Sequence, residues 1–303
     1  MEATHLATVG RRDGPARPLP PAADLLRGFS IEVTPRSKSA VEAIRQQMAP
    51  GSEVYIASIP GHSHHSAVAM ATALAKAGFR PVPHLAARSI ASFTQFNDFL
   101  ARLAGDAGVD RALVIGGDVE HPVGPYDSAL ALLQTGAIQR QGIRRIGLAC
   151  YAEPNRRVQT PMLEAALRDK LALLARDGLD AWLVSQFCFD GAAIVALVRR
   201  LRAEGVTAPL RIGMAGPADA RTLWKYALHC GIGNSMRVLG THVDAISNLL
   251  VRNAPDALLA EIAAAQIAEP ELAIGGVHLF SFGGVPAVTR WATAILAGRT
   301  GPG

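Results

Sequence analysis

The chain has 303 residues, of which half are hydrophobic and 18% are charged, so it can bury a large core and is not a disordered polymer. Its net charge of +5 suits anionic small molecules, but no run of Lys and Arg interleaved with aromatic residues marks a nucleic-acid surface. The three cysteines lie far apart without a CxxC pair, and no apolar run approaches membrane-spanning length. We therefore expect a cytoplasmic protein that binds neither nucleic acid nor membranes.

Residues 1–23 are rich in Pro, Arg and small side chains, and we expect them to form a short flexible leader before a single domain over residues 24–303. Within that domain, short β-type runs alternate with helical stretches. The runs are Phe29–Thr34, Val54–Ser58, Arg80–Leu85, Ala112–Gly116, Ile146–Tyr151, Trp182–Phe187, Leu210–Met214 and Gly276–Phe282.

The helical stretches carry recognisable end signals. The spacing predicts a helix over Gly191–Glu204, with Asp190 as its N-cap and Gly205 as its stop. Apolar residues recur there at helical spacing, at Ile194, Leu197, Val198 and Leu201. A second helix is expected over Ser66–Ala77.

The alternation of strands and helices indicates an α/β protein built from parallel β/α units. A doubly wound sheet would carry GxGxxG after its first strand, but this chain has Thr34-Pro35-Arg36-Ser37 at that place. Eight units favour a single (β/α)8 TIM-type barrel. The segment from Thr222 to Pro270 is mostly helical and longer than one unit needs.

Polar side chains follow most of the strand runs at the point where the apolar pattern stops. They are Glu32, Ser58, His84, Arg88, Asp118, Tyr151, Glu153, Gln186 and Asp190. The C-terminal strand ends of a barrel form one rim, so these side chains should converge on a single pocket. The alternative is that polar residues merely mark strand ends and helix caps, which explains Ser58 and Asp190 well.

Glu32 is explained poorly by that alternative. It is flanked by Ile31 and Val33 inside an apolar strand. A carboxyl group there faces the barrel interior or a dry pocket, and desolvation should raise its pKa. We therefore expect Glu32 to be functional.

At these strand ends the chain resembles the methylenetetrahydrofolate reductase family. The segment Phe29–Arg36 resembles the family's FSFEFFPPR motif, and Pro83–Arg88 resembles PHLTCR. Further segments follow in the family's order: Ile115–Asp118 for LRGD, Ala149–Glu153 for AGYPE, Ser185–Asp190 for TQFFFD and Val277–Phe282 for VHFYTLN. Each motif alone is weak, but together they cover nearly the whole chain.

The resemblance implies an oxidoreductase in which FAD, reduced by NADH or NADPH, passes hydride to methylenetetrahydrofolate. It implies Glu32 as general acid, Asp118 as a catalytic residue beside the flavin, and Gln186 and Phe280 as substrate-binding residues. The implied cofactor-binding residues are Ser58, His84, Arg88, Gly117, Asp118, Tyr151, Glu153, Arg156 and Lys170. No metal is implied, and assembly into a homo-oligomer stays open.

The chain departs from the family at two polar flavin contacts. Gly116 replaces the Arg of LRGD, and Asn155 replaces the His that follows YPE. These departures keep two alternatives open: a flavin-free reductase that uses NAD(P)H directly, and a folate-binding protein that transfers one-carbon or methyl groups.

A third alternative is a metal-dependent barrel hydrolase. The segment Gly61-His62-Ser63-His64-His65 places three histidines after the second strand run. Alternation along a strand would bring only His62 and His64 to one side, and no cluster of partner carboxylates is evident beyond Asp118. An exposed loop that leads into the next helix explains this segment more simply.

Overall fold

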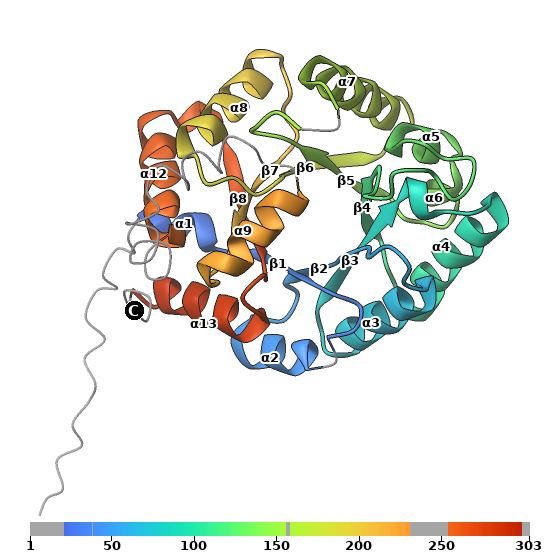
Figure 1. Cartoon of the computed structure of the whole chain (residues 1–303), viewed down its shortest axis with the longest axis horizontal. Helices are drawn as coiled ribbons and strands as arrows, with labels where there is room; N and C mark the ends of the chain where they lie inside the picture. Colours follow the sequence, from blue (N-terminus) through green and yellow to red (C-terminus); the bar gives the residue numbers. More distant parts are fainter. Residues whose placement is uncertain (1–20, 38, 156–157, 231–253, 299–303) are drawn as a thin grey trace, which may run out of the picture.

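In the computed structural model, which describes residues 21–37, 39–155, 158–230 and 254–298, eight parallel strands pair in chain order and close into a barrel (Figure 1). The strands are β1 Ser30–Val33, β2 Glu53–Ile56, β3 Arg80–Ala86, β4 Arg111–Ile115, β5 Arg145–Cys150, β6 Asp180–Ser185, β7 Leu210–Ala215 and β8 Ile274–Phe280. Each overlaps one predicted run, so the predicted (β/α)8 barrel is confirmed.

Helices surround the strands (Figure 1). They are α1 Pro21–Leu26, α2 Ala40–Gln47, α3 His64–Lys76, α4 Phe93–Ala107, α5 Ala129–Gln134, α6 Ala137–Arg140, α7 Thr160–Arg176, α8 Gly191–Ala203, α9 Ala220–His229, α12 Ala254–Ala268 and α13 Val285–Leu296, with 3-10 turns at Ala87–Ser89 and Pro270–Leu272. Among the described residues, no helix combines the length and apolar character needed to cross a bilayer.

The predicted boundary at residue 24 falls inside a packed helix. Residues 21–23 were assigned to the leader, but α1 begins at Pro21, and Ala23 and Leu26 are fully buried. The helix contacts α12 and β8, so its apolar face is part of the packed body. Residues 1–20 of the predicted leader lie outside the described residues.

The predicted caps of α8 are confirmed. The Asp190 carboxylate accepts a 3.0 Å hydrogen bond from the Ala193 amide, and Gly205 adopts a φ of 79° just after the helix. A left-handed conformation of this kind strains most residues with a side chain, so glycine ends the helix here. Helix α3 starts at His64, two residues before the predicted Ser66, because Ser63 caps it.

Alternation along the strands divides the core into two layers. Ile31, Val33 and Val54 point outward and pack against the helices, whereas Tyr55 and Leu113 lie in a separate cluster inside the barrel. Side chains therefore fill the barrel, as parallel barrels require.

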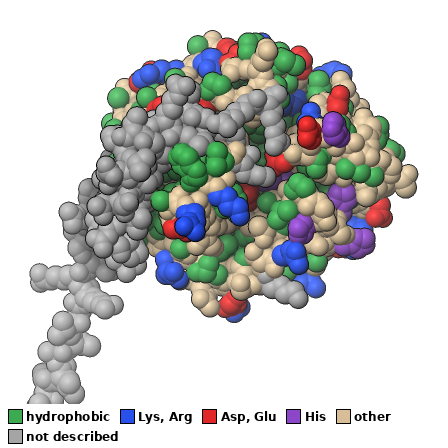
Figure 2. Space-filling view, in the orientation of Figure 1, with side chains coloured by type: hydrophobic (Ala, Val, Ile, Leu, Met, Phe, Trp, Pro, Cys, Tyr) green, Lys and Arg blue, Asp and Glu red, His purple; other side chains and the backbone are tan. Residues whose placement is uncertain are grey.

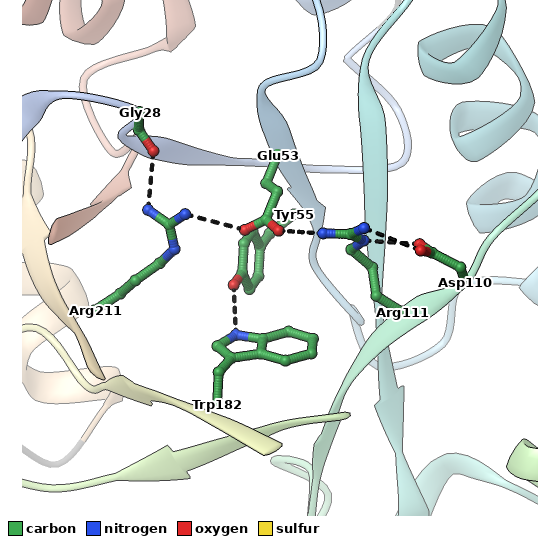
Figure 3. A network of polar contacts seen from close by, with 7 residues as sticks. All are labelled: Gly28, Glu53, Tyr55, Asp110, Arg111, Trp182 and Arg211. Carbon is green, nitrogen blue, oxygen red and sulfur yellow. Dashed lines mark hydrogen bonds and ion pairs between the residues drawn. The ribbon is translucent and has the colours of Figure 1, made fainter. Parts of the chain in front are cut away.

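A polar group, here termed the floor network, closes the interior near the N-terminal ends of the strands (Figure 3). The Glu53 carboxylate pairs with Arg111 on one side and with Arg211 on the other, the latter at 3.3 Å. Arg211 also donates to the Gly28 carbonyl at 2.9 Å. Two residues after Glu53 on the same strand, the Tyr55 hydroxyl accepts a 2.9 Å hydrogen bond from Trp182 Nε1, which extends the network (Figure 3).

We expect Gly147→Ala to destabilise the barrel, because a methyl group at Gly147 would lie 2.6 Å from the Trp182 ring. That ring cannot shift freely, since its Nε1 is bonded to Tyr55. Overpacking of this kind costs about 1–3 kcal/mol, which denaturant unfolding would measure. Gly105→Ala is the control: it lies in α4 with no atom within 4 Å of the added methyl, so it should be neutral or stabilising. Equal stabilities for the two variants would contradict this packing.

Candidate active site at the C-terminal mouth of the barrel

Glu32 lies on the inner side of β1, toward the C-terminal ends of the strands, which we term the mouth. Its neighbours Ile31 and Val33 belong to the outer core, so alternation turns the Glu32 side chain inward, where it is only 19% exposed. Burial raises the pKa of the Glu32 carboxyl; the charge of His84 opposes that shift and the charge of Asp118 adds to it. This agrees with the expectation from the strand sequence.

Two buried imidazoles flank the Glu32 carboxyl. His84 Nε2 on β3 lies 3.4 Å from Glu32 Oε2, and His278 Nε2 on β8 lies 3.8 Å from the same oxygen. His278 Nδ1 is 2.9 Å from the Ser30 hydroxyl, which fixes the orientation of this ring. Burial lowers the pKa of both histidines, that of His278 to about 3, so both imidazoles are neutral near neutral pH.

Neither His278 nor Ser30 was recognised as a site residue in the sequence. The signal was present, because His278 stands between Val277 and Leu279 just as Glu32 stands between two apolar residues. A polar residue at an inward position of an apolar strand is the shared feature. A closed barrel pairs its first and last strands, but the sequence does not give the register of that pairing, which brings Ser30 opposite His278.

Asp118 follows β4 at the rim and is exposed. Its charge acts on both Glu32 and Tyr151, so the structure brings these three predicted residues near one another. Gly117 has a φ of 96°, and a Cβ there would lie 3.2 Å from Ala86 Cβ, so glycine lets this loop approach β3 closely. Burial raises the pKa of Tyr151 to about 12, which keeps its hydroxyl protonated.

An aromatic wall stands beside Glu32 at the ends of β6 and β8. Phe280 lies edge-on to His278 at 5.0 Å and packs against Phe187 at 5.3 Å, measured between ring centroids. Phe282 extends the wall and stacks on Tyr226 of α9 at 4.1 Å. The predicted substrate residue Phe280 is thus next to the flanking histidine.

Gln186 follows β6 directly, and its side chain bends back onto the backbone of the next residue. Its Oε1 accepts a 3.1 Å hydrogen bond from the Phe187 backbone amide, and the backbone N–H of Gln186 donates to the Cys150 carbonyl at 2.8 Å. The half-buried carboxamide is therefore held at the C-terminal end of its strand, next to the aromatic wall.

The predicted cationic contacts are not assembled around Glu32. Arg88 Nε donates to the Asp127 carbonyl at 2.8 Å, which ties the guanidinium to the loop before α5. Lys170 is on α7, and its charge interacts with Cys150, whose side chain belongs to the outer core. Lys170 thus lies on the outer side of β5. Arg156 lies outside the described residues.

The remaining predicted contacts occupy loops at the strand ends. Ser58 is half-buried two residues after β2. The Glu153 carboxylate accepts a hydrogen bond from the Cys188 thiol at 3.2 Å, which joins the loops that follow β5 and β6.

The three histidines after β2 have local structural contacts. His64 begins α3, and its ring stacks on Phe99 at 4.4 Å, while His65 is exposed and lies 3.1 Å from the Ser63 hydroxyl. Figure 2 shows histidine side chains at the surface of the face that it draws. Within the part of the chain that the structure describes, no group of three His, Cys, Asp or Glu side chains is arranged to hold a metal ion.

No family model matches the chain. Among solved structures, it is similar to D-psicose 3-epimerase from Clostridium cellulolyticum H10, with 12% identity over 81% of this chain and 99% of that chain and a TM-score of 0.39. It is also similar to 3-keto-D-glucoside 4-epimerase from E. coli, with 13% identity over 89% and 98% of the two chains and a TM-score of 0.42. It is similar as well to the alpha subunit of tryptophan synthase from Legionella pneumophila str. Paris, with 11% identity over 82% of this chain and 99% of that chain and a TM-score of 0.40. Likenesses this distant carry no statement about the chemistry at the mouth.

Proposed function

We propose that the protein is an enzyme that reduces 5,10-methylenetetrahydrofolate to 5-methyltetrahydrofolate, with NADH or NADPH as the source of hydride and FAD as its carrier. The observation that carries the proposal is the buried carboxyl group of Glu32 between two neutral imidazoles. This is the place at which the motifs of the first, third and last strands resemble the reductase family.

The reaction needs an acid at this place. The methylene carbon of the substrate bridges two nitrogens, and protonation of one nitrogen breaks its bond to carbon and leaves a reactive iminium on the other. Hydride addition to that carbon then gives the methyl group. A carboxyl group whose pKa is raised by burial keeps the proton that this step consumes near neutral pH.

The neighbours of Glu32 suit a flat, polar aromatic substrate. The aromatic wall of Phe280 and Phe187 offers a stacking surface, and Gln186 offers a carboxamide to the amide-like edge of a pterin. Asp118 at the rim favours the protonated form of Glu32 by its charge. These residues would hold and orient the substrate and exclude water from the acid.

The described residues fit the ring portion of FAD better than its diphosphate. FAD, when bound, would accept hydride from the nicotinamide and hand it to the substrate. The resemblance assigns His84 and Asp118 to the flavin ring, but Arg88 is tied to a backbone carbonyl and Lys170 lies behind β5. Gly116 stands where the family has Arg, and no atom would lie within 4 Å of a Cβ there.

This incomplete set of phosphate contacts favours one second candidate, a reductase that transfers hydride from NAD(P)H to the folate without flavin. The acid, the aromatic wall and the carboxamide would keep the same tasks in that case. The two candidates therefore differ in the hydride carrier and agree on the substrate.

The visible absorption spectrum of the purified protein tests the proposal and separates the two candidates. With FAD as carrier, we expect a flavin spectrum that bleaches with anaerobic NADH or NADPH and returns when methylenetetrahydrofolate is added. A colourless protein that takes up no FAD yet consumes NAD(P)H only with the folate would support the flavin-free reductase. No reoxidation and no folate-dependent consumption would contradict both.

A further inference from the structure

The Nε2 atom of His84 is a buried nitrogen without a hydrogen-bond partner in the described part of the chain. The side chain is 9% exposed, and Nε2 is 3.4 Å from Glu32 Oε2, slightly beyond a normal hydrogen bond. Buried polar atoms are nearly always paired, so an unpaired nitrogen that faces a carboxyl group calls for a functional explanation.

The other groups that face Glu32 or His84 are less suited to exchange a proton with Glu32. His278 is 3.8 Å away, and its Nδ1 lies against Ser30. The Tyr55 hydroxyl accepts from Trp182, and its ring is 6.1 Å from that of His84. Asp118 is exposed at the rim and acts on Glu32 through its charge. Of the two imidazole nitrogens that face the carboxyl group, His84 Nε2 is the nearer, and it is the one that is both buried and without a hydrogen-bond partner among the described residues.

We propose that Glu32 and His84 share one proton, and that His84 returns a proton to Glu32 after each turnover. In the resting protein the Glu32 O–H points at His84 Nε2, and His84 carries its hydrogen on Nδ1. When Glu32 has given its proton to the substrate nitrogen, its carboxylate makes His84 more basic. His84 Nε2 then takes a proton from a hydronium ion or a buffer acid at the mouth, which remains in solution as water or as the conjugate base. That proton then passes to Glu32, which restores the resting pair.

The charges of the site agree with this cycle. Burial lowers the pKa of His84, while the Glu32 carboxylate raises it, so His84 is neutral beside protonated Glu32 and becomes more basic when Glu32 loses its proton. The two groups thus titrate as a coupled pair. His84 acts through Glu32 and is a positioning residue for the reaction proposed above, on which its role in turnover rests.

The first test needs no substrate. The carboxyl band of Glu32 is followed by infrared spectroscopy against pH, as the difference between the wild type and Glu32→Gln. In His84→Gln the midpoint of this band should move upward, because ionised Glu32 then lacks the neighbouring imidazole that can take up its proton and so lower the pKa of the carboxyl group. His65→Gln removes an exposed histidine and should leave the midpoint unchanged. An unmoved midpoint in His84→Gln would overturn the shared proton.

The second test separates the return of the proton from folate reduction. In His84→Gln we expect later turnovers to be slowed by about 10²-fold more than the first turnover, the lower end of general acid–base effects. Equal slowing of first and later turnovers would refute the return step. If no folate is reduced at all, the proposed function fails, but the infrared result still decides whether the proton is shared.

A third measurement covers the case in which the variant does not fold. The ¹⁵N chemical shift of His84 Nε2 in the wild type should be that of a nitrogen accepting a hydrogen bond, and it should change in Glu32→Gln. A shift typical of a protonated Nε2 in the resting protein would overturn the proposal.

Discussion

Glu32→Gln is expected to lower the rate of folate reduction by about 10²- to 10⁴-fold, the usual contribution of a general acid. The amide fills the same space, but it cannot give a proton to the substrate nitrogen. Oxidation of NADH or NADPH by a bound flavin needs no such proton, so that half-reaction should keep its rate. Stopped-flow absorbance of the two half-reactions measures both effects in one preparation.

The control is Glu271→Gln, which changes an exposed carboxylate and should leave both half-reactions unaltered. In the wild type, the folate half-reaction should slow as pH rises through the raised pKa of Glu32, because only the protonated form acts as an acid. If Glu32→Gln slowed both half-reactions equally, Glu32 would be a structural or cofactor-binding residue and the assignment of the acid would be wrong.

Glu53→Leu is expected to lower the free energy of unfolding by about 3–5 kcal/mol, the usual cost of removing one partner from a buried ion pair. The carboxylate holds both Arg111 and Arg211, and the Arg111 side chain is only 5% exposed. Without Glu53, two guanidinium groups at the floor of the barrel lose their shared counter-ion. The midpoint of denaturant unfolding would measure the loss.

Glu204→Leu is the matched control. Its carboxylate pairs with Arg168 at 3.5 Å on the surface, where the two side chains are 33% and 55% exposed, so the expected change is below about 1 kcal/mol. If Glu53→Leu and Glu204→Leu were equally stable, the floor network would contribute no more than a surface pair.

The eight strands could be predicted because each is a short apolar run bounded by glycine or polar residues. The inward position of Glu32 followed from the same alternation, since Ile31 and Val33 mark the outer face of β1. The start of the domain was missed because the proline and alanines of α1 resemble the leader, and only packing against α12 and β8 distinguishes them.

The floor network was not predicted, because its residues lie at the N-terminal ends of the strands, opposite the rim where the active site of a barrel is expected. The charged residues of this network each stand at or near the start of a strand: Glu53, Arg111 and Arg211. Each is two positions before a residue that faces the barrel interior, so each faces the interior as well. That shared spacing could have predicted a buried charged cluster. Their pairing could not be predicted, because β2, β4 and β7 are not neighbours and meet only across the closed barrel.

The position of Lys170 shows a limit of the resemblance. Lys170 lies on α7, the helix that follows β5. Whether its side chain faces the barrel mouth or the outer side of β5 depends on the residue at which α7 begins. Since α7 starts at Thr160, Lys170 is turned toward Cys150 on the outer side of the strand. The sequence motif alone does not fix that rotation.

The most direct test of the central claim is the product formed from methylenetetrahydrofolate and NADH or NADPH deuterated at the transferring position, with and without FAD, analysed by mass spectrometry. We predict 5-methyltetrahydrofolate with at least one of the two nucleotides. Deuterium in the methyl group would identify direct transfer, and its loss to solvent would identify transfer through the flavin. The absence of any methyl product with both nucleotides and added FAD would contradict the account.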